Sequence, residues 1–213
     1  MSARVVLASR NAKKVAELAR ILDNAGLDVE LISAAELPGA PEVAETGATF
    51  EENALLKAVA LASFSGLPAL ADDSGLTVEA LNHMPGILSA RWSGAFGVGY
   101  HGGVDQANVA LVLDQLADTP DDRRAAKFVC AAALALPDGR SYVLRGELTG
   151  TILRAPRGDG GFGYDPIFVP KGLQRTSAEL SGAEKDEISH RGRALRELVP
   201  VLREVLAPDL DRL

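Results

Sequence analysis

Polar side chains crowd the junction between a short apolar strand and the helix after it, in the stretch VVLASRNAKKVAELARIL at residues 5–22. With Asn11 as N-cap, Lys14 falls at the third helical position, beside the free backbone N–H groups of the first turn. Such a turn suits the oxygens of a phosphate. The alternative is that Asn11 only caps the helix while Lys13 and Lys14 are solvated. A Walker A loop is excluded, because no GxxxxGK run is present here.

A second lysine lies on a helix that we predict from residue 50 to 65, with Thr49 as N-cap and Glu52 reaching back as a capping box. This helix is apolar nearly all round except for Asn53 and Lys57, which lie one turn apart. Because such a helix is buried against a sheet, its ammonium group needs an anionic partner. A carboxylate partner indicates a structural role and a phosphate a functional one. Both hold if the lysine pairs with an acid when no ligand is bound.

The segment ALADDSG at residues 69–75 puts two carboxylates at the end of an apolar strand, where α/β sheets bind ligands. We expect the strand to end in a turn over residues 72–75. Successive strand side chains face opposite ways, so Asp72 and Asp73 have different roles unless the chain turns between them. With Glu45 from the preceding loop, they make a candidate oxygen-ligand cluster for Mg²⁺. The alternative is a turn formed for purely local reasons.

Alternating strands and helices must position these residues. The early part of the chain predicts a strand at 4–9, a helix at 12–25 closed by Gly26, and a strand at 29–33. Residues 82–103 are mostly loop, and a helix follows near 104–117. Two long apolar strands, 125–136 and 141–153, are joined by a PDG turn and predict a hairpin. We expect the last 25 or so residues to form one amphipathic helix with a kink at Pro200.

Composition limits the class of protein. The 213 residues are 47% hydrophobic, enough for a substantial core, and we expect a single domain over 1–213. The net charge of −7 argues against direct nucleic-acid binding, which needs a basic face. No apolar run approaches about 18 residues and no signal segment is evident, so we expect a cytoplasmic protein without a membrane span. Cys130, inside KFVCAAALAL, is expected in the core.

Several familiar sites are disfavoured. Glycines match GxGxxG at 97–102 and again at 158–163, but neither run follows a well-formed buried strand, so a Rossmann site is not expected. The histidines lack a zinc spacing, and no GxSxG elbow is present.

Six motifs occur in order along the chain: SRNAKK, ETGATFEENALLKA, ALADDSGL, PGILSARWSG, GGFGYDPIF and EKDEISHRGRAL. Together they resemble the inosine triphosphate pyrophosphatases, over about residues 5 to 206. The resemblance implies an α/β fold with a mixed central β-sheet and a long hairpin, flanked by helices, in two lobes around a cleft. It also implies a Mg²⁺-dependent homodimer that cuts dITP, ITP or XTP to the monophosphate and pyrophosphate, which cleans the nucleotide pool.

The resemblance also assigns roles by position. The phosphate-binding turn falls on Ser9, Arg10, Asn11, Ala12, Lys13 and Lys14. The second phosphate lysine is Lys57, and Ser74 is a substrate contact beside the catalytic acid. The acidic metal and catalytic positions fall on Glu45 and Asp73, with Asp72 beside them. The positions that hold the base are Phe162, Gly163, Tyr164, Asp165, Lys185, His190 and Arg191.

A mechanism follows as a hypothesis. Asp73 is the candidate general base or activator of a metal-bound water that attacks the α-phosphorus. Packing Asp73 against Asp72 and Glu45 is expected to raise the carboxylate pKa values, so activity should require Mg²⁺. His190 or Arg191 is the candidate donor to the 6-oxo group of the base. In the structural alternative, His190 and Arg191 are an exposed helix start.

Two departures from the family and two rival functions accompany this hypothesis. Ser9 stands where relatives often have threonine, and the loop GAFGVGYHGGVD is longer and richer in glycine than expected. The rivals are a pyrophosphatase for another modified nucleotide and a nucleotide sensor that binds without cutting.

Overall fold

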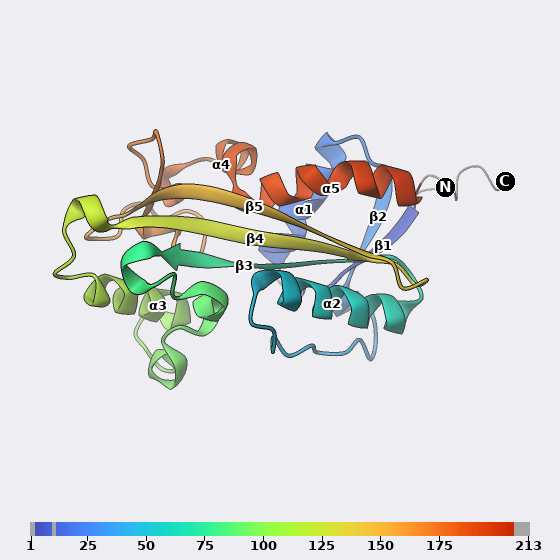
Figure 1. Ribbon diagram of the computed structural model, residues 1–213, viewed down its shortest axis with the longest axis horizontal. Coiled ribbons are helices and arrows are strands. Elements are labelled where there is room, and N and C mark those ends of the chain that lie inside the picture. Colours follow the sequence, from blue (N-terminus) through green and yellow to red (C-terminus); the bar gives the residue numbers. More distant parts are fainter. Residues whose placement is uncertain (1–2, 10–11, 207–213) are drawn as a thin grey trace. The chain divides into compact units, whose positions relative to one another are not determined.

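The computed structural model describes residues 3–9 and 12–206, with only the backbone of residues 12 and 13 (Figure 1). Its strands are β1 (Ala3–Leu7), β2 (Val29–Ser33), β3 (Ala69–Val78), β4 (Ala125–Ala135), β5 (Ser141–Ile152) and β6 (Phe168–Pro170). Its α-helices are α1 (Ala12–Asn24), α2 (Phe50–Ser65), α3 (Gly103–Gln115), α4 (Gly182–Ile188) and α5 (His190–Leu206). Most of the elements predicted from the sequence are confirmed to within a few residues.

The strands form one mixed sheet in the order β2-β1-β3-β4-β5-β6. β1 is parallel to both β2 and β3, whereas β5 and β6 are antiparallel. The predicted hairpin of β4 and β5 is confirmed, closed by a hydrogen bond from Leu136 N to Arg140 O. Its turn contains Gly139 at φ 94°, a left-handed conformation that glycine adopts without strain. The α/β fold with a mixed sheet and a long hairpin is therefore confirmed.

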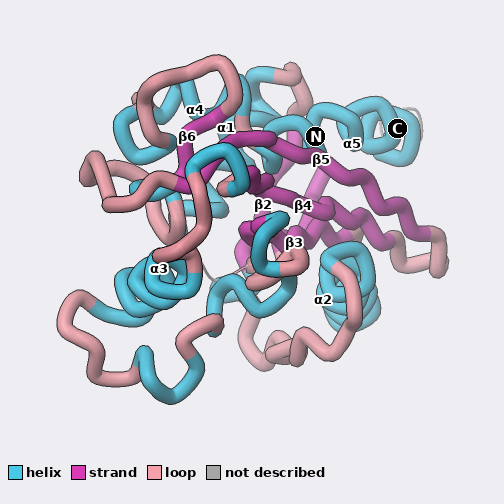
Figure 2. The backbone as a smooth tube through the Cα atoms, turned by 60° about the vertical axis from the view of Figure 1, so that its left-hand side comes forward, coloured by secondary structure: helices cyan, strands magenta, loops and turns pink. Residues whose placement is uncertain are grey.

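The chain divides into two compact units. The first contains Met1–Asp73, Cys130–Gly146 and Arg191–Leu213, and the second contains Ser74–Val129 and Glu147–His190. In the first unit, α1 and α5 cover one face of the sheet and α2 covers the other (Figure 2).

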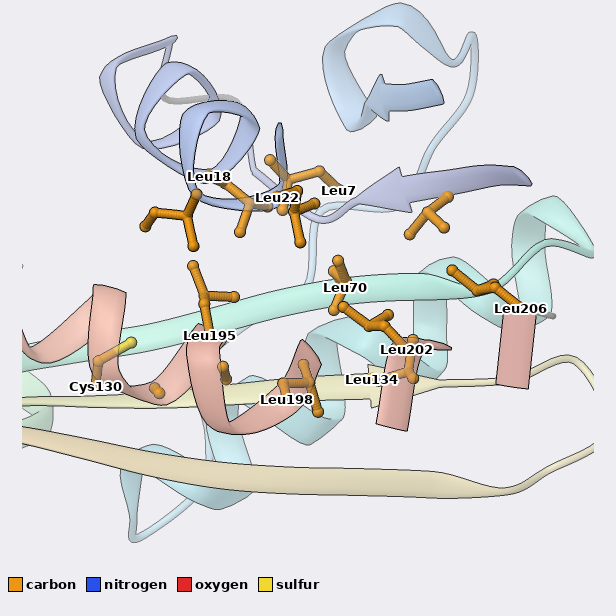
Figure 3. Packing of buried hydrophobic residues seen from close by; sticks show 14 of the residues in the cluster. Leu7, Leu18, Leu22, Leu70, Cys130, Leu134, Leu195, Leu198, Leu202 and Leu206 are labelled. Carbon is orange, nitrogen blue, oxygen red and sulfur yellow. The ribbon is translucent and has the colours of Figure 1, made fainter. Parts of the chain in front are cut away.

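Leucines from α1, β1, β3 and α5 fill the core of the first unit (Figure 3). Leu195, Leu198 and Leu202 recur at helical spacing along α5 and are buried, as the amphipathic pattern predicted. Cys130 is fully buried among them, and burial raises the pKa of its thiol to about 12. The predicted core role of Cys130 is confirmed.

The second unit has its own apolar core, in which α3 packs on the sheet. Val109 and Val112 of α3 are buried in one cluster with Leu76 and Val78 of β3. Phe128 and Phe168 join this cluster, with ring centroids 4.4 Å apart. Tyr164 and Ile167 belong to the same cluster, so this core anchors the loop that carries the candidate residues Phe162–Asp165.

Capping sets the position of α2. Thr49 accepts a hydrogen bond from Glu52 N, and Gly66 ends the helix at φ 67°. The Glu52 carboxylate accepts from Ala48 N at 2.6 Å, one residue earlier than a capping box requires. The predicted start and end of α2 are confirmed, while the reciprocal bond is displaced by one residue.

One predicted element differs from the structure. β3 runs without interruption through residues 72–75, where a turn was expected, because tertiary partners on both faces hold the two aspartates in extended conformation. The helix predicted for the last 25 or so residues is confirmed as α5, which begins at His190 and contains Pro200. The shorter helix α4 precedes it, and Ser189 lies between the two with ψ 148°. Among residues 3–9 and 12–206, no helix is both long and apolar enough to cross a membrane.

Candidate active site

Two consecutive aspartates of β3 organise the candidate site. β1 ends at Leu7, opposite Leu70, so Asp72 and Asp73 extend past the carboxyl end of the neighbouring parallel strand. Because the strand continues through them, their side chains point to opposite faces of the sheet. Asp73 meets α2, and Asp72 meets α1 and α5. The chain does not turn between the two acids, which was the condition stated for their having different roles.

On the α2 face, Lys57 bridges two carboxylates. Its Nζ lies 3.0 Å from Glu45 Oε1 and 3.4 Å from Asp73 Oδ1. The other oxygen of Asp73 accepts a hydrogen bond from Asn53 Nδ2 at 3.0 Å. Asn53 and Lys57 are the two polar residues that the sequence singled out on this helix. The carboxylate partner expected for Lys57 is confirmed.

The neighbouring charges and the burial of this cluster shift the pKa values of Asp73 and Lys57. Burial raises the pKa of Asp73 and the Glu45 carboxylate adds to this, so that the opposing effects of Lys57 and Asn53 do not restore the ordinary value. Burial by itself would lower the pKa of Lys57, but the carboxylates of Asp73, Asp72 and Glu45 raise it overall. The lysine therefore stays charged, while Asp73 binds a proton more readily than an ordinary aspartate.

On the opposite face, four buried or half-buried side chains alternate in charge. Asp72 Oδ2 accepts from Lys14 Nζ at 2.9 Å and from Arg191 Nε at 3.2 Å. Arg191 Nη1 also contacts Glu17 Oε2 at 2.5 Å. Arg191 is only 3% exposed, so the structural alternative of an exposed helix start at this residue is wrong. Arg191 is instead a buried cation that joins α5 to α1 and β3.

This pairing changes the expected chemistry of Asp72. Burial would raise the pKa of Asp72, but Lys14 and Arg191 hold it well below the ordinary value. The expectation that its pKa is raised together with that of Asp73 is therefore wrong. Asp72 is an ionised partner of two cations.

The proposed metal ligands are only partly brought together. Within the described part of the chain, no group of three or more His, Cys, Asp or Glu side chains is arranged to hold a metal ion. The predicted trio of Glu45, Asp72 and Asp73 is split, since Asp72 faces away from the other two. Glu45 and Asp73 both contact one ammonium group and are hard oxygen donors. This donor set fits Mg²⁺, which proteins often bind through one or two carboxylates together with substrate phosphates.

The start of α1 lies next to the Lys14 contact. α1 begins at Ala12, which makes Lys14 the third helical residue, as predicted. The backbone oxygen of Ser9 accepts from Ser33 Oγ at 3.0 Å, which ties the end of β1 to β2. Arg10 and Asn11 lie outside the described residues, as do the side chains of Ala12 and Lys13. Their predicted phosphate contacts stay predictions.

Candidate base-binding residues gather in the second unit. Phe162 N donates to Asp165 Oδ2 at 2.8 Å, and Lys185 Nζ lies 2.5 Å from the same oxygen. That ammonium also lies 5.0 Å from the centroid of the Phe162 ring, a cation–π contact. Phe162 and Asp165, from one loop, therefore form a cluster with Lys185 of α4, and this cluster offers an aromatic face and a cation.

Other residues assigned to the base have structural contacts. The hydroxyl of Tyr164 is buried and donates to the backbone oxygen of Ser89 at 2.8 Å. The His190 ring stacks on Phe128, with centroids 5.0 Å apart and an interplanar angle of 16°. Ser74, which was predicted to contact substrate beside the catalytic acid, is the half-buried residue of β3 that follows Asp73. These contacts leave the predicted roles of the three residues as predictions.

Two carboxylates that contact candidate site residues, Glu17 and Asp105, were not predicted from the sequence. Glu17 follows Lys14 by three positions on α1, and this helical spacing was the signal that both belong to one face. Asp105 of α3 accepts from Gly163 N at 3.0 Å, a contact for which the sequence carried no signal. Both are carboxylates whose partners come from distant segments.

The fold and site together define an α/β protein in which carboxylates and lysines line the carboxyl end of a parallel strand pair. The sequence model of the Ham1 family matches residues 5–201. The chain belongs to the Ham1 family.

Relatives match over nearly their full length. A dITP/XTP pyrophosphatase of Streptomyces coelicolor is 59% identical over 203 residues, which are 95% of this chain and 98% of the relative. One of the same name from Nocardia farcinica is 60% identical over 201 residues, 94% of this chain and 95% of the relative.

This chain is also similar to proteins of known structure. The crystal structure of a nucleoside-triphosphatase, dITP/XTP pyrophosphatase, from Mycobacterium abscessus is 56% identical with a TM-score of 0.74, covering 94% of this chain and 100% of that chain. A HAM1 protein from Coxiella burnetii is 44% identical with a TM-score of 0.83, covering 95% of this chain and 99% of that chain.

Proposed function

We propose that this protein hydrolyses non-standard purine nucleoside triphosphates, such as dITP, ITP and XTP, to the monophosphate and pyrophosphate. The names of the relatives support the substrate class. The observation that carries the proposal is the cluster in which Lys57 bridges Glu45 and Asp73 at the carboxyl end of β1. At this largely buried place an anionic phosphate can replace a carboxylate as the partner of the lysine.

The lysines supply the attraction for phosphate. A nucleoside triphosphate brings about four negative charges, against a chain whose own net charge is −7. Lys14 and Lys57 approach consecutive residues of β3 from opposite faces, past the end of β1. A polyphosphate at this edge of the sheet meets cations from both faces, and the N-terminus of α1 adds a favourable dipole.

Asp73 is the proposed general base. Its raised pKa and its fixed contacts with Asn53 and Lys57 suit a carboxylate that takes up a proton during the reaction. Asp73 accepts a proton from water as the water oxygen bonds to the α-phosphorus. The bond from that phosphorus to the bridging oxygen breaks, and pyrophosphate leaves with the bonding electrons.

A divalent cation completes the proposed site. Glu45 and Asp73 are the residues that would hold Mg²⁺. When bound, Mg²⁺ supplies positive charge that stabilises the phosphate oxygens and the leaving pyrophosphate. Lys57 must then shift its pairing from the carboxylates to phosphate, which a flexible lysine side chain permits.

Base recognition is assigned to the cluster of Phe162, Asp165 and Lys185. Phe162 offers an aromatic face for stacking, and the Lys185 ammonium beside it is a donor for a 6-oxo group. Adenine carries an amine at that position, which cannot accept this hydrogen bond. Arg191, the earlier candidate donor, is engaged with Glu17 and Asp72.

Incubation with dITP, XTP, GTP and ATP in the presence of Mg²⁺, followed by identification of the products, tests this function. We expect monophosphate and pyrophosphate from dITP and XTP and little product from the other two. Orthophosphate release, preference for a modified pyrimidine, or tight binding without cleavage would each contradict the proposal. The homodimer and the cytoplasmic location stay predictions, and light scattering on the purified protein tests the former.

A further inference from the structure

Every residue of the segment Phe162–Asp165 has a partner that restrains it. Asp165 Oδ2 accepts from Phe162 N and pairs with Lys185, and the Tyr164 hydroxyl donates to Ser89. These contacts come from within the segment, from α4 and from the loop before α3. A further restraint comes from a residue to which neither the motifs nor the proposed mechanism gives a role.

That restraint is the carboxylate of Asp105. Asp105 lies in the first turn of α3, and its Oδ2 accepts from Gly163 N at 3.0 Å. Gly163 has φ 59°, a left-handed conformation that favours glycine. Its N–H belongs to the peptide bond that follows Phe162. Fixing this peptide plane therefore fixes the backbone from which the aromatic ring projects.

Packing does not replace this hydrogen bond. A cavity of about 620 Å³ lies between α3 and the loop of residues 156–166, and Asp105, Val109, Gly163 and Phe162 are among its lining residues. Space on this side means that apolar contacts with α3 support the Phe162 segment only in part. The hydrogen bond from Gly163 N to Asp105 therefore restrains the segment on the side where packing is incomplete.

We propose that Asp105 is a positioning residue for base recognition. It holds the Gly163 peptide, and through that peptide it holds the Phe162 ring in the orientation in which Lys185 lies beside the ring. The inference rests on the proposed function, since it assigns the Phe162 ring to the base of the substrate. Asp105 belongs to the second unit, whereas the carboxylates and lysines proposed to handle phosphate belong to the first. Substitution of Asp105 should therefore weaken binding of a nucleotide that carries a base and leave the binding of phosphates alone unchanged.

The test compares Asp105→Ala and Asp105→Asn with the unmodified protein. Alanine removes the acceptor, while asparagine keeps an oxygen that can accept from Gly163 N. Asp114→Ala, at an exposed position of the same helix, is the matched control. The readouts are KM and kcat for dITP and the inhibition constant of inorganic tripolyphosphate, which has phosphates and no base. Thermal unfolding of all variants verifies folding.

We expect Asp105→Ala to raise KM for dITP between about threefold and about tenfold, with kcat within about twofold, as for loss of one hydrogen bond of ordinary net strength. The tripolyphosphate inhibition constant should not change, and Asp105→Asn should recover most of the lost affinity. Asp114→Ala should behave as the unmodified protein.

The inference is overturned if KM for dITP is unchanged in Asp105→Ala, or if KM and the tripolyphosphate constant rise together. The same conclusion follows if asparagine gives no recovery. Failure of the proposed function is visible separately, because the unmodified protein would then release no pyrophosphate from dITP. That result would overturn the inference as well.

Discussion

The ammonium of Lys57 and the carboxylate of Asp73 lie 3.4 Å apart, with 14% and 8% of their side chains exposed. Both side chains are thus largely withdrawn from water, one on a nearly all-apolar helix and the other on a central strand. Such a pair is costly to bury unless further partners satisfy it, and here Glu45 and Asn53 do so. The arrangement keeps a carboxylate in place for chemistry without leaving its charge unpaired.

Asp73→Asn tests the proposed base. The amide cannot accept the proton of the attacking water, so we expect kcat for dITP to fall by at least about 100-fold. Asp23→Asn, at an exposed position near the end of α1, should leave kcat unchanged. Steady-state pyrophosphate release measures both. A fall of less than about tenfold, equivalent to about 1.4 kcal/mol of barrier, would rule out Asp73 as the base.

Glu45→Gln tests the metal site. Loss of one of two carboxylates should raise the Mg²⁺ concentration for half-maximal activity by at least about tenfold. Excess chelator should abolish the activity of the unmodified protein, and added Mg²⁺ should restore it. Glu42→Gln, in the same loop and exposed, is the matched control. Activity that persists in chelator would show that the reaction does not need Mg²⁺.

Asp72 gives a prediction for stability and pH. Burial opposes ionisation of Asp72, but Lys14 and Arg191 outweigh it, so its pKa is lower in the folded protein than in the unfolded chain. Its ionised form therefore stabilises the fold above about pH 4, and this contribution is lost as the pH falls toward the lowered pKa. We expect Asp72→Asn to lower the free energy of unfolding by about 3 kcal/mol at neutral pH, because it leaves buried cations short of a partner.

Urea unfolding at about pH 7, pH 5 and pH 3 measures this effect. The difference between the unmodified protein and Asp72→Asn should shrink toward low pH. A difference that is independent of pH would mean that the carboxylate charge does not stabilise the fold.

Gly75→Ala tests the close approach that lets β3 continue. A Cβ at Gly75 would lie 2.3 Å from Ser89 Oγ and 2.5 Å from Gly86 O. Overpacking of this kind should lower the free energy of unfolding by about 1–3 kcal/mol. Gly182→Ala, where a Cβ would meet no atom within 4 Å, should be close to neutral. Chemical unfolding compares the two, and equal stability would show that the strand adjusts freely at Gly75.

Local signals in the sequence were sufficient for most elements. Thr49 and Gly66 predicted both ends of α2, because capping depends on the residues of the helix ends themselves. The turn at 137–139 predicted the hairpin for the same reason. At residues 72–75 the local signal failed, since Asp, Ser and Gly favour turns but the tertiary partners of Asp72 and Asp73 keep them extended.

By itself, the sequence determined the element types, the buried apolar stripe of α5, the polar pair of Asn53 and Lys57 on α2 and the resemblance to a known family. Only the tertiary structure decided that Asp72 and Asp73 serve opposite faces, that Arg191 is a buried partner of Glu17 and Asp72, and that Asp105 holds Gly163. The reason is physical. Periodicity and capping act over a few neighbouring residues, whereas a charged side chain takes its role from partners that folding brings together from distant segments.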